Sequence, residues 1–292
     1  MPSHTTRAAR WQLIFSLALF GTVGLFVRGL RIPVSVLAST QGFIGASFLY
    51  LLLRAGGKRP DRATLQKRLP LLLLSGSFIG INWLLLFEAY QYTTIATATL
   101  CNYFSPVFVV LLSPFLLKER LTPVKLICVF TALGGMFLLS GFLEQKAPTE
   151  HELLGMLLGT GSAVFYALMV LLNKRLSDIS PYDRTIVQLL AASATVLPYA
   201  LHSVSPAALS FSPLDVLLIA TIGIVHIGFC YVLYFGAFDR LSAQSISALS
   251  YLDPVVAVLV SAIVLREPMS LFAVLGAICI LGSSFVSVLT EK

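Results

Sequence analysis

The chain has 292 residues, of which 57% are hydrophobic and only 11% are charged, with a formal net charge of +7. Its mean hydropathy is +0.90. Because a soluble domain carries about 25% charged residues, this composition excludes an ordinary soluble protein and predicts an integral membrane protein. The positive charge lies in loops between apolar runs, where it serves membrane orientation, so we expect no nucleic-acid partner.

Ten apolar runs approach the roughly 20 residues that a helix needs to cross a bilayer. In chain order they cover residues 11–27, 34–53, 69–90, 95–117, 123–142, 153–173, 183–201, 214–236, 243–265 and 269–289. The first run is followed directly by further runs, so we interpret it as an anchor helix and not as a cleaved signal. The loops are short, and the fold class predicted is an all-α integral membrane protein with ten transmembrane helices.

Loop charges predict the orientation of these helices. Most Lys and Arg residues, among them Arg54, Lys58 and Lys125, fall in segments that share a face with the N-terminus. Cytoplasmic loops carry an excess of Lys and Arg. We therefore expect both termini in the cytoplasm and a multi-pass protein of the cytoplasmic (inner) membrane of a prokaryote.

The second half of the chain repeats the first without a gap. The segment Phe87 to Tyr90 recurs 148 positions later as Phe235 to Phe238, and Tyr103 to Val107 recurs as Tyr251 to Val255. Five spans per copy is an odd number, so consecutive copies enter the membrane from opposite faces. The sequence predicts two inverted five-helix repeats, residues 1–146 and 147–292, an organisation typical of secondary transporters.

Two loops carry signals for the start of a helix. Thr149 and Glu152 have the spacing of a capping box, in which each side chain bonds the other residue's backbone amide. Ser212 precedes Pro213 and Asp215, an N-cap followed by a proline in the first helical turn. We expect the sixth and eighth spans to begin at these residues.

The residues that end each repeat carry a family resemblance. The fourth span ends in a motif from Pro106 to Thr122 that contains Leu117-Lys118-Glu119, and the ninth ends at Leu265-Arg266-Glu267-Pro268. Together with the five-plus-five repeat, this resembles the EamA-type members of the drug/metabolite transporter superfamily, over nearly the whole chain. The resemblance implies a carrier of metabolites, often an exporter of amino acids or similar solutes. It further implies a cavity between the halves and a peripheral position for the fifth and tenth helices.

Proline lies near the middle of one span in each half. Pro106 and Pro254 each remove an amide donor and free the carbonyl four residues earlier, at Asn102 and Ser250. In hydrocarbon a freed carbonyl must face protein, water or a ligand. We expect two kinked, polar backbone segments at the midplane, where a carrier places its site; kinks that serve packing alone are the alternative.

Two ionisable residues lie at mid-depth in the second half. Asp253 replaces the neutral Ser105 of the first half, and His226 replaces Phe78. An intramembrane carboxylate is costly, so Asp253 is predicted to bind a solute ammonium group or to take up a proton that drives transport. His226 could relay that proton or pair with Asp253; the alternative for both is a buried, hydrogen-bonded packing role.

Amide, hydroxyl and aromatic side chains lie at comparable depth in several spans. Such groups suit an amphipathic organic solute, and aromatic faces attract cations. Hydrogen bonding between helices is the other interpretation. The predicted solute-binding set, besides Asp253 and His226, is Asn82, Trp83, Asn102, Tyr103, Tyr166, Tyr231, Ser250 and Tyr251.

Charged pairs near the two mouths are candidate gates. Arg28 and Glu88 fall at similar depth toward the outer end, and Lys174 or Arg175 falls at the depth of Asp239 toward the inner end. A carrier with two open states needs two such gates. Long basic side chains that reach toward the membrane interface are the alternative interpretation.

These residues favour a secondary carrier that exports an amino acid or amine-like metabolite by alternating access, driven by a solute gradient or by proton exchange. No Lys or Arg lies at mid-depth, which disfavours phosphorylated solutes, and no phosphate-binding loop is present. An exporter of drugs or organic cations is the main alternative; a membrane enzyme or a channel is disfavoured. We expect no cofactor, a small-molecule solute and the bilayer as partners, and a monomer or homodimer.

Overall fold

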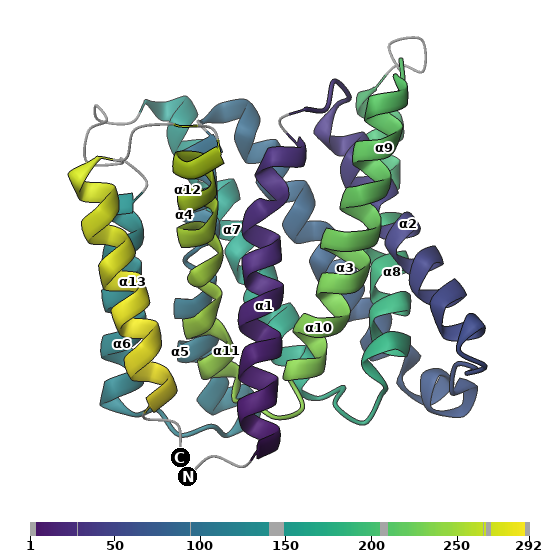
Figure 1. Ribbon diagram of the computed structural model, residues 1–292, viewed down its shortest axis with the longest axis horizontal. Coiled ribbons are helices and arrows are strands. Elements are labelled where there is room, and N and C mark those ends of the chain that lie inside the picture. Colours follow the sequence, from purple (N-terminus) through teal and green to yellow (C-terminus); the bar gives the residue numbers. More distant parts are fainter. Residues whose placement is uncertain are drawn as a thin grey trace.

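The computed structural model describes residues 4–27, 29–93, 95–139, 149–204, 210–264, 266 and 270–289. All regular elements in these residues are helices. Eight helical segments have the length and hydropathy to cross a membrane, and two shorter apolar helices cover Pro123–Leu138 and Val274–Ser283. Helix α1 begins, and helix α13 ends, on the same face of the bundle (Figure 1).

The helices of the two halves follow in the same order. The first half holds α1 (His4–Val27), α2 (Val34–Ala55), α3 (Arg62–Tyr92), α4 (Ile95–Asn102), α5 (Ser105–Leu117) and α6 (Pro123–Leu139). The second half holds α7 (Glu150–Lys174), α8 (Pro181–Ser203), α9 (Pro213–Thr221), a π-helix called η3 (Ile222–Phe229), α10 (Cys230–Ala237), α11 (Ala243–Ser250), α12 (Leu252–Val264) and α13 (Leu271–Leu289).

The predicted capping box at Thr149 and the predicted N-cap at Ser212 are confirmed, and Ser212 proves to form a capping box as well. The Thr149 amide donates to the Glu152 carboxylate at 2.7 Å, and the Glu152 amide donates back to the Thr149 hydroxyl at 3.3 Å. The Ser212 amide donates to Asp215 at 2.9 Å, with Pro213 in the first turn of α9. These bonds satisfy amides that the first turn of a helix leaves without intrahelical partners.

Equivalent residues interrupt the helices of both halves. Helix α4 ends at Asn102 and α11 at Ser250, each a few residues before a proline in the first turn of the next helix. Lys118 and Arg266, also 148 positions apart, adopt left-handed φ angles of 58° and 56°. A non-glycine residue seldom takes this conformation, so its occurrence at equivalent positions marks a shared local structure.

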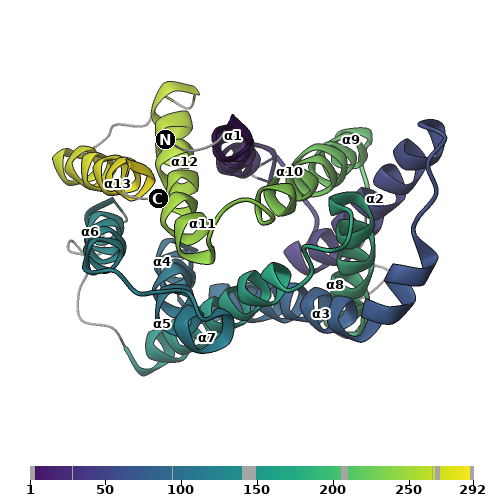
Figure 2. The same cartoon turned by 90° about the horizontal axis from the view of Figure 1, so that it is seen from below.

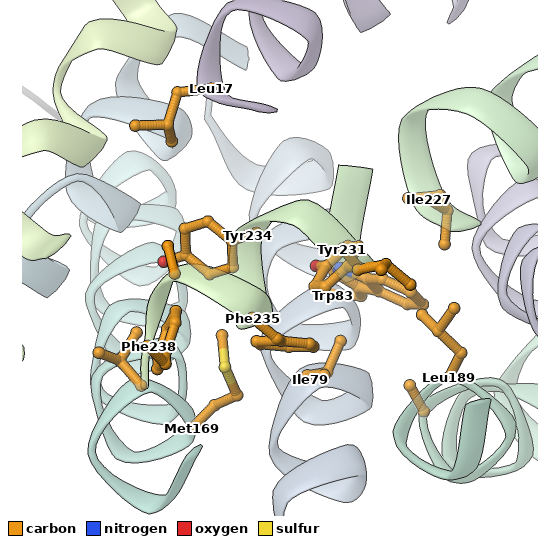
Figure 3. Close-up of a cluster of buried hydrophobic side chains, with 14 of the residues drawn as sticks. Leu17, Ile79, Trp83, Met169, Leu189, Ile227, Tyr231, Tyr234, Phe235 and Phe238 are labelled. Atoms are coloured by element: carbon orange, nitrogen blue, oxygen red, sulfur yellow. The ribbon is translucent and has the colours of Figure 1, made fainter. Parts of the chain in front are cut away.

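Aromatic side chains of α10 fill the centre of the bundle. Tyr231, Tyr234, Phe235 and Phe238 pack together and against residues of α1, α3, α7 and α8 (Figure 3). In contrast, α6 and α13 pack on each other at one edge of the bundle (Figures 1 and 2). A Cβ atom at Gly135 would lie 2.7 Å from the Gly276 carbonyl oxygen, so this pair depends on small residues, as membrane helix contacts commonly do.

Candidate functional site

A hydrogen bond joins the two interrupted helices at the centre of the chain. The hydroxyl of Tyr103, between α4 and α5, donates to Oδ2 of Asp253 at 3.1 Å. Asp253 lies in the first turn of α12. The rings of Tyr103 and Tyr251 have centroids 6.5 Å apart, and Tyr251 is fully buried. The structure therefore brings together three of the predicted residues, contributed by both halves.

The Tyr251 hydroxyl has no hydrogen-bond partner among the described residues. A buried hydroxyl without a partner costs about 1–3 kcal/mol, and such groups are uncommon in folded proteins. In contrast, the Ser250 hydroxyl is used within its own helix, where it donates to the Ile246 carbonyl at 2.9 Å.

The predicted amide groups bond to each other. Asn82 on α3 donates to the side-chain oxygen of Asn102 at 3.0 Å and to the backbone oxygen of Ser162 at 2.9 Å. The Ser162 hydroxyl also donates to Asn102, at 2.9 Å. These bonds tie α3, α4 and α7 together where α4 ends, which is the structural alternative considered for these residues.

The predicted aromatic residues gather around α10. The hydroxyls of Tyr166 and Tyr234 lie 2.7 Å apart, and Tyr231 lies beside Trp83 of α3 (Figure 3). Phe20 of α1 meets Tyr231 edge to face, with ring centroids 5.3 Å apart. Tyr234 and Phe20 were missed by the sequence reasoning. Their signal is weak: Tyr231 and Tyr234 are three residues apart, the spacing of one helix face.

His226 bonds to α1. Its Nε2 lies 3.0 Å from the Thr22 hydroxyl, which itself donates to the Leu19 carbonyl at 2.7 Å. Since that hydroxyl has one proton, it accepts a hydrogen bond from His226. The residue before Thr22, about 100° away around the helix, meets α12: a Cβ atom at Gly21 would lie 2.7 Å from the Asp253 carbonyl oxygen. Helix α1 thus contacts both His226 and the backbone of Asp253.

Basic side chains hold the end of α10 on the face where α1 begins, which is the predicted inner end. The guanidinium of Arg184, which is fully buried, donates to the carbonyls of Phe235 at 2.5 Å and Leu176 at 3.1 Å. It also forms an ion pair of 3.5 Å with Asp239. Lys174 donates to the carbonyls of Phe238 and Leu241 at 2.6 and 2.7 Å. Sequence reasoning placed Lys174 and Asp239 here but missed Arg184.

The two cations at this end stabilise the charged form of Asp239 only in part. Burial raises the pKa of Asp239, while the nearby Arg184 and Lys174 cations lower it. The net direction is upward, so burial outweighs the attraction of the two cations. Arg175, the other predicted inner residue, donates to the Leu116 carbonyl at 2.6 Å.

The end of the bundle opposite to the start of α1, which is the predicted outer end, is hollow. A cavity of about 500 Å³ lies where α1 gives way to α2 and where α3 and α8 end, and Phe87, Tyr90, Gln91 and Tyr199 form part of its wall. The Tyr199 hydroxyl donates to the carboxylate of Glu88. Arg28, the predicted partner of Glu88, lies outside the described residues.

The repeat-ending motif has a structural role that sequence reasoning did not assign. The carboxylate of Glu119 accepts hydrogen bonds from the backbone amides of Ala243 at 2.9 Å and Gln244 at 3.4 Å. It therefore caps the start of α11 from the other half of the chain, where a negative charge also meets the positive end of the helix dipole. The left-handed turn at Lys118 positions this carboxylate.

Comparison with known proteins agrees with this architecture. The sequence profile of the EamA-like transporter family matches residues 9–141 and again 153–289. The uncharacterized transporter YxxF of Bacillus subtilis (strain 168) is 26% identical over 281 residues, covering 96% of this chain and 89% of the relative. An uncharacterized transporter of Archaeoglobus fulgidus is 29% identical over 280 residues, covering 94% of each.

Two more distant proteins are also similar. Human solute carrier family 35 member G1 is 25% identical over 221 residues, covering 73% of this chain and 60% of the relative. A solved crystal structure superposes with a TM-score of 0.86 at 20% identity over 97% of both chains, which shows a shared fold. With family matches over both halves, this chain belongs to the EamA-like transporter family of the drug/metabolite transporter superfamily and is a multi-pass membrane transporter.

Proposed function

We propose that the chain exports a small organic metabolite, of amino acid or amine-like chemistry, across the cytoplasmic membrane by alternating access. Two inverted five-helix repeats would form the moving halves, with both termini in the cytoplasm. The helix breaks at Asn102 and Ser250 and the left-handed turns at Lys118 and Arg266 support this repeat, because they recur at one fixed offset. Carriers of this kind bind their solute between the halves.

The Tyr103–Asp253 hydrogen bond is the observation that carries the proposal. It places a carboxylate from one half against a hydroxyl from the other, at the two interrupted helices. Any motion of one half against the other changes this contact. A solute ammonium group that binds Asp253 would thus bias the equilibrium between two states of the carrier.

We assign proton coupling to Asp253. A carboxylate in a membrane interior is costly when charged and unpaired, so it tends to hold either a proton or a cation. Exchange of one for the other would couple inward proton movement to outward solute movement. His226 bonds to Thr22 and is assigned the positioning of η3 against α1.

The two ends of the bundle supply the gates. At the inner end, Lys174 and Arg184 hold the last carbonyls of α10, and Asp239 pairs with Arg184. At the outer end, Glu88 bonds to Tyr199 beside the cavity. Opening the inner mouth requires that α10 part from these two cations, so the arrangement corresponds to a state closed toward the cytoplasm.

An exporter of organic cations is the second candidate. The cluster of Phe20, Trp83, Tyr231 and Tyr234 favours it, because aromatic faces bind amphipathic cations without specific hydrogen bonds. The two candidate solutes differ in one group, the carboxylate that an amino acid carries. An amino acid needs a residue of the site to bind this carboxylate, whereas an organic cation does not.

Counterflow in proteoliposomes tests the function. Vesicles loaded with an unlabelled amino acid or amine should accelerate uptake of the labelled solute, as a carrier does and a channel does not. Asp253→Asn should abolish this stimulation, while Asp178→Asn, the same chemical change at an exposed surface pair, should keep it. Uptake that is independent of solute on the opposite side would exclude alternating access.

A further inference from the structure

Three residues that line the outer cavity have counterparts, 148 positions later, near the inner end of α10. The offset that relates Phe87 to Phe235 also relates Pro33 to Pro181 and Gln91 to Asp239. Pro33, Phe87 and Gln91 line the outer cavity. Phe235 and Asp239 surround the inner end of α10, where a Cβ atom at Gly236 would lie 3.7 Å from Pro181. Equivalent residues thus enclose a hollow in one half and a packed region in the other.

A buried cation occupies the packed region around Phe235 and Asp239. The guanidinium of Arg184 lies over the ring of Phe235, 5.8 Å from its centroid, donates to the Phe235 carbonyl and pairs with Asp239. Arg184 has Val36 as its counterpart in the first half. The outer half therefore presents the equivalent ring and polar wall without the cation.

The outer cavity has the chemistry to receive such a cation from elsewhere. Phe87 and Tyr90 contribute rings whose centroids are 6.0 Å apart, and Tyr199 bonds to the carboxylate of Glu88. None of the residues that line the cavity in the described part of the chain is Lys or Arg. Glu88 also stands where the inner half has Gly236, so the outer half has a carboxylate that the inner half lacks at that position.

We propose that the outer cavity is a second solute site, which binds a guanidinium or primary ammonium group against Phe87, Tyr90 and Tyr199. The carboxylate of Glu88, to which the Tyr199 hydroxyl donates, would supply the negative charge. The packed inner half holds its own guanidinium, that of Arg184, over Phe235, the ring equivalent to Phe87. A cavity of about 500 Å³ has the size of a small-molecule site. The site would capture or release a cationic solute at the outer mouth, apart from Asp253. In this respect the inference extends the proposed function, because it gives the charge of the solute.

Ligand-observed NMR titration of the full chain in lipid nanodiscs tests the site directly. The probes are benzylguanidinium and benzylammonium, with benzyl alcohol as the uncharged control. We expect the two cations to bind and benzyl alcohol to bind at least several-fold more weakly. Glu88→Gln should weaken the cations roughly five- to tenfold, since it removes the negative charge. Asp178→Asn should leave the affinity unchanged.

Two further variants change the cavity in opposite directions. Val36→Arg introduces the guanidinium at the position equivalent to Arg184 and should abolish binding of the probes. Gln91→Asp reproduces the carboxylate equivalent to Asp239 and should tighten binding of the cations several-fold, which keeps the test informative if Val36→Arg does not fold. Cation binding that is unchanged in Glu88→Gln and Gln91→Asp would overturn the proposal.

The result is independent of transport. Binding that depends on Glu88 in a chain that shows no counterflow would retain the site and remove the proposed carrier function. Counterflow that depends on Asp253, without cation binding that depends on Glu88, would retain the carrier and remove the second site.

Discussion

The hydroxyl of Tyr103 and the carboxylate of Asp253, 150 residues apart, form a hydrogen bond of 3.1 Å between the two interrupted helices. Tyr103 lies between α4 and α5, and Asp253 is the second residue of α12, directly after the break that separates it from α11. Both residues therefore lie where a membrane span is interrupted. The contact therefore reports the relative position of the two halves.

Tyr103→Phe should weaken solute binding without abolishing transport. The substitution removes one hydrogen bond to Asp253 and keeps the ring, and a bond of this kind contributes about 1 kcal/mol, or roughly fivefold in affinity. Solute affinity measured from the concentration dependence of counterflow checks this. An affinity equal to that of the unsubstituted chain would mean that Tyr103 only packs.

Arg184→Gln should destabilise the fold strongly. It leaves the Phe235 and Leu176 carbonyls and the Asp239 carboxylate without their partner, and breaking a buried pair costs about 3–5 kcal/mol. Arg184→Lys should recover part of the loss, because an ammonium keeps the charge but cannot contact several acceptors at once. Thermal unfolding in detergent measures both; equal stability of all three chains would contradict the role assigned to Arg184.

Glu119→Ala should destabilise the chain by about 1 kcal/mol, the usual cost of losing an N-cap. The carboxylate accepts from the amides of Ala243 and Gln244, and both would lose a partner. Arg120→Ala, at the next position, is the matched control. A loss for Glu119→Ala no larger than that of the control would show that the cap is dispensable.

His226→Phe, which restores the first-half residue Phe78, should leave the pH dependence of transport in place. His226 bonds to Thr22 of α1, whereas the carboxylate of Asp253 accepts from Tyr103. The rate can fall because η3 loses a contact with α1. If the pH profile becomes flat, as is expected for Asp253→Asn, then His226 takes part in proton transfer.

Much of the architecture could be predicted from the sequence because the signals are local. Hydropathy predicted ten spans, and eight helical segments of the described residues have the length and hydropathy to cross a membrane. The Thr149 and Ser212 capping boxes depend on residues three positions apart. The offset between Pro106 and Pro254 predicted two equivalent helix breaks, and the structure has them.

Partners distant in sequence could not be predicted in the same way. Arg184 is an ordinary loop-flanking cation in the sequence, and only the fold shows that its acceptors are Phe235 and Leu176. Glu119 lies in a recognisable motif, yet its role depends on α11 of the other half. The π-helix around His226 arises where glycines of η3 and α2 pack closely: a Cβ atom at Gly45 would lie 2.8 Å from the Gly223 carbonyl oxygen.

Proton release on solute binding tests the central claim, that Asp253 exchanges a proton for the solute. The purified chain in weakly buffered detergent is mixed with the solute identified by counterflow, and the pH change is followed with a dye. We predict that the unsubstituted chain releases protons in proportion to bound solute, and that Asp253→Asn releases none. Equal proton release from both chains, or solute binding without release in the unsubstituted chain, would contradict the claim.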